Sequence, residues 1–423
     1  MKSTGMGEDM QLTKLAFKIF FGTKIFSLCS IFILSLMLLL ILFSDPLFAA
    51  QPPQVSAATA AVIDVKTGQV LYDKHMHLRK YPASTTKVLT AIIAIEEGNL
   101  NETVTVSRNA AYQEGSSIWL AEGEQLTLKE LVYAIMLASG NDAAVAIAEH
   151  ISGSVEDFAD LMNKKAEDMG AENSTFLNPH GLPQSGHYST AYDLAMIMRY
   201  ALQNETFAEI TATKYKTISW PDHEWDRGLR NHNKLLWQYD DATGGKTGYT
   251  KAAGRCLITS ASRNNREVVA VVLNSPDDWL DCTRLLDYGL DEFNEVVVVE
   301  AGTSIYDLDW EQTLEKKLNL IARNSIAVAV PVDDKINVKK KIELLPELKL
   351  PVTEGQKVGK LKLYHDDRLL DSTDLVAGND LNFSSVFLRF WYRLTYMLRN
   401  FAQKQDFKYL SRNKLIMETE LMI

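Results

Sequence analysis

The sequence predicts an α+β fold in which an antiparallel sheet is flanked by helices and carries a helical insertion. Three observations support this prediction. Strand-like alternation occupies residues 60–72, helical patterns fill residues 88–201, and strand patterns return from residue 246. Strands at both ends of a segment can share one sheet when the helices between them pack on it. The chain has 423 residues, which leaves room for a further small domain.

The first two predicted elements are a β-hairpin and a buried helix that begins at a serine. Residues 60–72 alternate around Lys66-Thr67-Gly68, which predicts a β-hairpin that turns at the glycine. The stretch 88–95 is apolar on all sides, as is typical of a helix buried in the centre of a domain. It follows directly on Pro82-Ala83-Ser84, so Ser84 is predicted at the N-terminus of a buried helix.

Two further helices meet at a polar link. Thr127 and Glu130 have the spacing of a capping box before the helical stretch 131–137. Another helical pattern runs over 142–151, so Ser139-Gly140-Asn141 is the tight link between the two helices. The remaining predicted elements are helices over 155–169, 191–201 and 283–293 and strands over 246–248, 257–261 and 268–273.

The C-terminal third differs in character. After residues 296–299 come short β-like runs such as 326–332 and 360–364, which predict a separate small β domain. Residues 384–401 combine arginines with large apolar and aromatic residues, and a basic tail follows. This pattern favours an amphipathic helix that lies in a membrane interface, and the alternative is a terminal helix docked on its own domain.

The N-terminus carries an export segment. Four lysines precede an uncharged, mostly Leu, Ile and Phe stretch over residues 25–44. This stretch is longer than the apolar core of about 7–15 residues in signal peptides and matches the roughly 20 residues that span a bilayer. A cleaved signal peptide and a retained anchor both remain open, and Ala49-Ala50 favours cleavage. The chain thus divides into an export segment (1–50), a sheet-and-helix domain (51–295), a β-rich domain (296–383) and a membrane-associating helix with its tail (384–423).

Composition and charge exclude several classes of function. The formal net charge of -10 argues against a nucleic-acid partner, because neutralising phosphates requires a basic surface. The exported part keeps Cys256 and Cys282, so at most one disulfide could form, and buried free thiols are expected. No His-Glu-x-x-His motif occurs, and neither a metal nor an organic cofactor is predicted.

Ser84-x-x-Lys87 carries the candidate chemistry. It places a hydroxyl and an amine about one helical turn apart, on one face of the helix. A serine is a weak nucleophile until a base takes its proton, and a neutral lysine can be that base. Burial and a second cation both lower a lysine pKa, and Lys246 is the candidate cation. The motif alone is weak, because Ser411-x-x-Lys414 repeats it in the tail, where no function is expected.

The order of three motifs is a more specific signal than the Ser-x-x-Lys motif alone. Ser84-x-x-Lys87, Ser139-Gly140-Asn141 and Lys246-Thr247-Gly248 occur in the order found in penicillin-binding proteins and their β-lactamase relatives, and the set resembles that signature. The stretches that begin at Asn178 and Asn233 resemble the D-alanyl-D-alanine carboxypeptidase branch in particular. The resemblance extends into the β domain, and the C-terminal helix resembles that branch's membrane anchor.

This resemblance implies a penicillin-binding/β-lactamase-like fold and an exported serine peptidase at the outer face of the cytoplasmic membrane or in the cell wall. It implies removal of the terminal D-alanine from the peptidoglycan stem peptide, with β-lactam antibiotics as inhibitors. Ser84 is the expected nucleophile, Lys87 the general base and Ser139 a proton relay.

The same resemblance implies the substrate-binding residues. Asn141 is expected to bind the substrate's peptide, and Lys246 and Thr247 its terminal carboxylate. Gly248 would let substrate lie along the strand edge, and the backbone N–H of Tyr249, with that of Ser84, would form the oxyanion hole. The family usually adds a basic residue near the carboxylate, for which Arg255 and Arg284 are the candidates.

Four alternatives are open to different degrees. A DD-endopeptidase or a transpeptidase differs only in the amine that leaves or accepts. A class A β-lactamase needs a glutamate with an asparagine four residues later, and none lies between Asn141 and Lys246. A non-catalytic wall-binding scaffold would not need the intact motif residues. His180 and His187 allow a Ser-His-Asp interpretation, but no Gly-x-Ser-x-Gly elbow occurs, and loop packing is expected for both.

Overall fold

The computed structural model describes Ser35 and residues 52–221, 223–310, 313, 317–332, 336–346, 348–365, 368–382, 390 and 417–422. The predicted export segment and the predicted membrane-associating helix therefore lie outside the described residues, apart from Ser35 and Phe390. Among the described residues, no helix combines the length and the apolar character that crossing a membrane requires.

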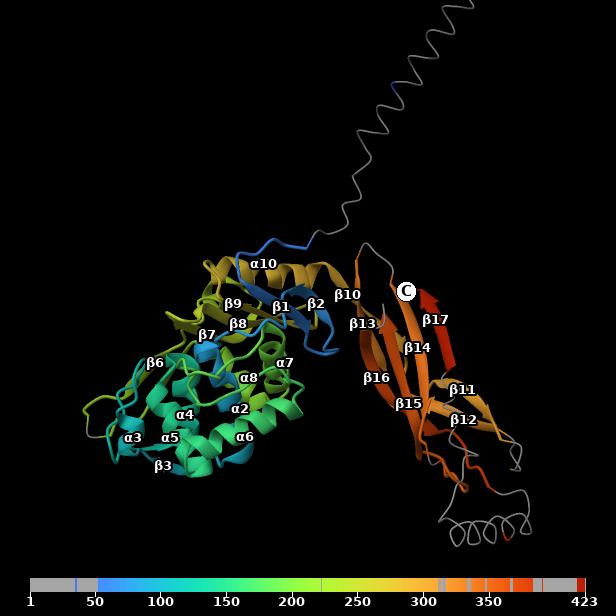
Figure 1. The fold of residues 1–423 in the computed structure, drawn as a ribbon, viewed down its shortest axis with the longest axis horizontal. Helices are drawn as coiled ribbons and strands as arrows, with labels where there is room; N and C mark the ends of the chain where they lie inside the picture. Colours follow the sequence, from blue (N-terminus) through green and yellow to red (C-terminus); the bar gives the residue numbers. More distant parts are fainter. Residues whose placement is uncertain are drawn as a thin grey trace, which may run out of the picture. The chain divides into compact units, whose positions relative to one another are not determined.

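A five-stranded antiparallel sheet organises the first part of the chain (Figure 1). In spatial order its strands are β2 (Val70–Lys74), β1 (Thr59–Asp64), β9 (Arg266–Leu273), β8 (Gly254–Arg263) and β7 (Ala242–Thr250). β1 pairs with β2 on one side and with β9, some 200 residues later, on the other. The prediction that early and late strands share one sheet is confirmed.

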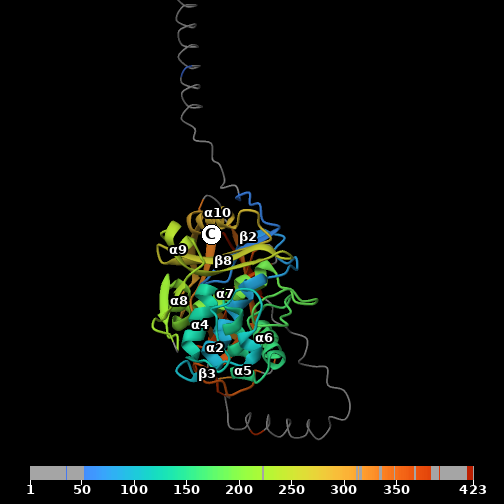
Figure 2. The ribbon, with the colours of Figure 1, turned by 90° about the vertical axis from the view of Figure 1, so that its left-hand side faces the viewer.

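Each face of this sheet covers its own apolar core. In β8, Cys256 and Ile258 belong to the core shared with the helical insertion, whereas Leu257 belongs to the core under α10 (Asp278–Asp291). This alternation is the two-residue period of a strand that is buried on both faces. Figure 2 shows the layers from another side, with α10 above β8 and α2 below it.

The helical insertion packs on the face opposite α10. Its main helices are α2 (Lys87–Glu97), α4 (Leu128–Tyr133), α5 (Asn141–Ser152), α6 (Val155–Asp168), α7 (Ala191–Leu202) and α8 (Glu205–Ala212), with the short α3 (Arg108–Ala111) beside them. The short α9 (Leu235–Gln238) lies on the other side, because Leu235 belongs to the core under α10. The predicted capping box is present, since Thr127 and Glu130 exchange backbone hydrogen bonds. α4 does not run on to residue 137 as an α-helix, because Ala134–Ala138 form the π-helical segment η2.

Two short two-stranded sheets were not predicted. β3 (Thr103–Thr105) pairs with β4 (Gln125–Thr127), and β5 (Tyr215–Ile218) pairs with β6 (Arg227–Arg230). The predicted start of the last helix at residue 283 is also wrong, because α10 begins at Asp278. There the Asp277 side chain caps it by accepting from the Leu280 N–H.

After α10, the elements of the described C-terminal part are strands, and the single described residue Phe390 is helical. β10 (Phe293–Val299) pairs with β13 (Ile326–Pro331), and a six-stranded sheet has the order β11-β12-β16-β15-β14-β17. Its strands are β11 (Ser304–Asp309), β12 (Lys317–Ala322), β16 (Arg368–Ala377), β15 (Lys357–His365), β14 (Asn337–Leu344) and β17 (Met417–Met422). The interpretation of 384–423 as helix and basic tail alone needs correction, because β17 lies in that region. It pairs with β14, which would otherwise be an open sheet edge.

Candidate active site

Ser84 and Lys87 lie at the entry to the buried helix. Ser84 belongs to the 3-10 turn η1 (Ala83–Thr86) rather than to the helix proper, and Lys87 is the first residue of α2. Lys87 Nζ lies 3.1 Å from Ser84 Oγ. Lys87 is completely buried and Ser84 is half-buried, so the amine is shielded from water while the hydroxyl can be reached.

The partners of Lys87 orient its nitrogen. Nζ donates to Asn141 Oδ1 at 2.7 Å and to the His180 carbonyl at 2.8 Å. The orientation of the Asn141 amide is fixed at its other end, because Nδ2 donates to the Glu114 carbonyl at 2.6 Å. A neutral amine has two N–H groups and one lone pair. When both N–H groups bind these two oxygens, the lone pair faces Ser84 Oγ and can accept its proton.

Burial and charge both favour that neutral amine. Desolvation lowers the pKa of Lys87 well below its usual value, and the nearby charge of Lys246 lowers it further. Asp142 acts in the opposite direction with a smaller effect. Burial also lowers the pKa of Lys246, to about 7.

Ser139 and Lys246 form a second hydroxyl–amine pair. Ser139 follows η2 in a left-handed conformation with φ 64°, which is uncommon for serine and typical of positions under functional constraint. Lys246, fully buried in β7, donates to Ser139 Oγ at 3.0 Å and to the Thr247 carbonyl at 2.8 Å. Because Ser139 Oγ accepts from Lys246, its own hydrogen remains available for another acceptor.

The strand β7 passes directly beside Ser84. A Cβ added to Gly248 would lie 3.0 Å from the Ser84 backbone nitrogen, so a side chain there would press on the backbone of the nucleophile turn. Thr247 is half-buried, and the Tyr249 side chain is exposed. Among the described strands, β7 ends the sheet and has one unpaired edge. The structure therefore brings the residues of all three motifs together.

Comparison with known proteins agrees with this geometry. The family model described as D-alanyl-D-alanine carboxypeptidase matches residues 47–277, and that of the penicillin-binding protein 5 C-terminal domain matches residues 293–382. The first match alone covers more than half of the chain. The chain belongs to the D-alanyl-D-alanine carboxypeptidase family.

Relatives span most of the chain. D-alanyl-D-alanine carboxypeptidase DacF from Bacillus subtilis (strain 168) is 34% identical over 359 residues, covering 81% of this chain and 92% of its own length. The crystal structure of penicillin binding protein 5 from Haemophilus influenzae has a TM-score of 0.67 at 30% identity and covers 79% of this chain and 99% of its own. That of D-alanyl-D-alanine carboxypeptidase DacD from Francisella tularensis has a TM-score of 0.60 at 27% identity, covering 81% and 97%. This carboxypeptidase is thus a serine peptidase of the penicillin-binding type, which acts on peptidoglycan outside the cytoplasm.

Both histidines near the site hold the loop that carries the His180 carbonyl. His187 Nδ1 accepts from the Leu177 N–H at 3.1 Å, and its Nε2 lies 3.2 Å from Thr86 Oγ1. His180 Nδ1 accepts from the Leu182 N–H at 3.2 Å. Burial lowers the pKa of His180 to about 3 and that of His187 to about 4, so both rings are neutral. These contacts agree with the loop packing predicted for them.

Gly181, in this loop, supports the nucleophile turn. Its φ is 85°, and an added Cβ would lie 1.8 Å from the Ala83 carbonyl oxygen. Gly181→Ala is therefore expected to displace the residue before Ser84 and to destabilise the fold by about 3 kcal/mol. Gly153→Ala is the matched control, because Gly153 has φ 83° but open space around it. Thermal unfolding should show a clearly larger loss for Gly181→Ala, and equal losses would contradict the predicted clash.

Neither predicted arginine lies in the site. Arg255 is next to Cys256, which faces the helical core, so strand alternation directs Arg255 to the α10 side, where it lies 3.5 Å from Asp278. Arg284, on α10, donates to the Gln54 carbonyl at 3.2 Å. A basic residue outside the three motifs, His232, does lie near the site. Burial lowers its pKa, with further lowering by the charges of Lys246 and Arg230.

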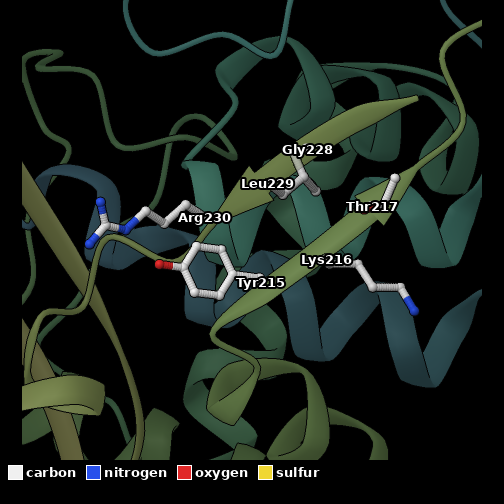
Figure 3. A pocket seen from close by; sticks show the side chains of 6 residues that line it. All are labelled: Tyr215, Lys216, Thr217, Gly228, Leu229 and Arg230. Atoms are coloured by element: carbon white, nitrogen blue, oxygen red, sulfur yellow. The ribbon is translucent and has the colours of Figure 1, made fainter. Parts of the chain in front are cut away.

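A shallow cavity of about 320 Å³ lies on the β5–β6 hairpin (Figure 3). It is lined by Tyr215, Lys216, Thr217, Gly228, Leu229 and Arg230. None of these residues belongs to the three motifs, so the cavity is distinct from the site of chemistry. Among the described residues, no cluster of His, Cys, Asp and Glu could hold a metal ion.

Proposed function

We propose that this carboxypeptidase removes the terminal D-alanine of the peptidoglycan stem pentapeptide through an acyl-enzyme on Ser84. The observation that carries the proposal is the orientation of Lys87. Nζ lies 3.1 Å from Ser84 Oγ, and when the neutral amine donates its two N–H groups to Asn141 and His180, its lone pair is left for the Ser84 hydroxyl. Such a pair supplies a nucleophile and its general base without a histidine.

Acylation uses both hydroxyl–amine pairs. Ser84 Oγ attacks the carbonyl carbon of the penultimate D-alanine, and Lys87 takes the hydroxyl proton. The C–N bond then breaks, and Ser139, whose Oγ accepts from Lys246, delivers a proton to the leaving amine of D-alanine. Lys246 regenerates the Ser139 proton. Before deacylation, Lys87 releases the proton that it took from Ser84 and Lys246 regains one by exchange with solvent, so both lysines return to their starting states. The backbone N–H groups of Ser84 and Tyr249 are the proposed donors to the oxyanion, where loss of one donor typically costs about 3 kcal/mol.

Deacylation completes the cycle. Water attacks the ester carbonyl, Lys87 accepts its proton, and that proton returns to Ser84 Oγ as the bond to the acyl group breaks. Lys246 and Thr247 are the proposed ligands of the terminal carboxylate, and Asn141 binds the substrate's peptide as well as Lys87. The unpaired edge of β7 beside Gly248 supports binding of the peptide as an added strand.

The deciding experiment is mass spectrometry of residues 51–423 after incubation with benzylpenicillin and, separately, with a peptide that ends in D-Ala-D-Ala. A penicilloyl adduct on Ser84 together with release of one D-alanine is expected. An adduct without D-alanine release would favour transpeptidation, and the absence of any adduct would overturn the enzymatic proposal.

We also propose export through residues 1–50 and attachment to the membrane surface through the basic, aromatic segment that begins at residue 384. Deleting all of 384–423 would also remove β17 from the β14 edge. Reversing the charges of Arg389, Arg393 and Arg399 to glutamate is a cleaner change. In a chain that starts at Gln51, we expect the variant to lose sedimentation with anionic vesicles and to keep its D-alanine release. Undiminished sedimentation would contradict membrane attachment through this segment.

A further inference from the structure

Two strongly exposed tryptophans lie in loops that Arg227 connects beside the active site. Trp119 is 77% exposed and Trp225 is 63% exposed. Tryptophan is highly buried on average, and neighbouring exposed apolar groups mark binding surfaces. Neither side chain takes part in the proposed chemistry.

The loop of Trp119 is fixed by the residue after Asn141. Asp142 accepts from Ser117 Oγ at 2.6 Å and from the backbone N–H groups of Ile118 at 3.0 Å and Leu120 at 3.1 Å. Trp119 itself has φ 65°, a conformation that costs energy for a bulky residue and persists only where the surroundings impose it. The carboxylate therefore holds a rigid turn that presents the indole to solvent.

This loop is also continuous with the active site. The Asn141 N–H donates to the Ser116 carbonyl at 2.7 Å, and Asn141 Nδ2 donates to the Glu114 carbonyl. The same asparagine binds Lys87. A ligand that contacts Trp119 is thus adjacent to the place where the peptide reacts.

Arg227 joins the Trp119 loop to the β5–β6 hairpin. Its guanidinium forms a buried ion pair with Glu124 at 2.9 Å, and its Nη2 lies 3.5 Å from the Trp119 carbonyl oxygen. Its Cζ also lies 4.8 Å from the ring centre of Trp220. The backbone of Trp119 and the ring of Trp220 therefore contact the same side chain.

Three further aromatic side chains lie close together in the loop between β5 and β6. The His223 ring stacks on Trp220, with ring centres 4.0 Å apart and planes inclined by 21°. The Trp225 ring centre lies 6.4 Å from that of His223. We call these four residues, Trp119, Trp220, His223 and Trp225, the aromatic platform.

We propose that the aromatic platform binds the glycan part of peptidoglycan while the stem peptide occupies the active site. The proposal rests on the proposed function only for the identity of the polymer. Flat aromatic faces pack against the C–H faces of pyranose rings, and carboxylates and imidazoles bind sugar hydroxyl and N-acetyl groups. Glu224 and Asp226 are exposed beside the platform. A membrane-interface surface combines aromatic with basic residues instead, so these acids favour a sugar ligand over lipid.

The test compares two substrates that end in the same D-Ala-D-Ala peptide, one free and one attached to a disaccharide. Trp225→Ala and Trp119→Ala are each expected to raise the ratio of KM for the disaccharide-linked peptide to KM for the free peptide by about 10-fold. Tyr306→Ala, which removes an exposed aromatic ring from β11, is the matched control and should leave the ratio unchanged.

A second measurement separates this proposal from the proposed function. Glycan strands stripped of peptide are titrated into Ser84→Ala protein with and without Trp225→Ala, and tryptophan fluorescence reports binding. If stripped glycan binds and Trp225→Ala weakens that binding, the result supports the platform even if no D-alanine is released in any assay. An unchanged KM ratio, an equal loss on both substrates, or failure of stripped glycan to bind would overturn the proposal. Loss of vesicle binding with an unchanged KM ratio would assign the platform to the membrane instead.

Discussion

Replacing Ser84 with alanine is expected to abolish the penicilloyl adduct and to lower the rate of D-alanine release by at least about 10⁴-fold. The change removes the only oxygen that can carry the acyl group in the proposed mechanism. Among the described residues, the Ser84 side chain has one hydrogen-bond partner, Lys87, which keeps its bonds to Asn141 and His180. The fold should therefore survive, and intact-mass spectrometry and D-alanine release measure the loss.

The chain offers its own matched control for this variant. Ser411 begins a second Ser-x-x-Lys match in the C-terminal tail. Ser411→Ala should form the adduct and release D-alanine at the unmodified rate. An adduct that persists in Ser84→Ala and disappears in Ser411→Ala would reverse the assignment of the nucleophile.

Replacing Lys87 with glutamine is expected to slow acylation by benzylpenicillin by about 10³-fold, within the roughly 10²–10⁴-fold that a general base contributes. Glutamine is neutral, but its amide nitrogen cannot accept the Ser84 proton. Lys87→Arg distinguishes a base from a simple positive charge, because arginine keeps the charge and does not deprotonate. Stopped-flow acylation rates should fall in both variants. A near-normal rate in Lys87→Arg would show that charge, not basicity, is required.

The proposed role of Lys87 as general base determines how kcat/KM should change with pH. Below the lowered pKa of Lys87, the ammonium form has no lone pair, so kcat/KM should rise as pH increases through that pKa. Lys246 has a pKa of about 7, so its loss of charge above that pH should weaken binding of the substrate carboxylate. The profile should be bell-shaped, and the rising limb should be absent in Lys87→Gln.

The parts of the fold that the sequence predicted are those with strong local patterns. The β1–β2 hairpin, the apolar α2 and the capping box before α4 depend on neighbouring residues, and β9 has a long apolar run. β5 and β6 have four residues each, and only Ile218 in β5 and Leu229 in β6 are buried apolar side chains, so they lack an apolar pattern to reveal them. β17 forms because the edge of β14 is free, which is a tertiary effect.

The motifs also predicted which residues come together in the active site, but not all of the contacts that these residues make. Asn141 was expected to bind substrate, whereas the structure also gives it a hydrogen bond to Lys87 and one to the Glu114 carbonyl in the loop before Trp119. The His180 carbonyl, a second partner of Lys87, could not be predicted because any residue supplies a carbonyl. Of the residues that hold this region together, only Asp142 had a signal in the sequence. It is an acidic residue in the first turn of α5, a position where acids are common.

Asn141 binds both Lys87 and the Glu114 carbonyl, and this has a consequence for how drug resistance could evolve. A substitution of Asn141 would release the loop at Glu114, and a loop that moved into the site could exclude a bulky β-lactam. The same substitution would also remove a hydrogen-bond acceptor from Lys87. Escape from the antibiotic and loss of turnover would then arise from the same change. Selection for resistance should therefore avoid this position and act on residues that border the site without touching either lysine.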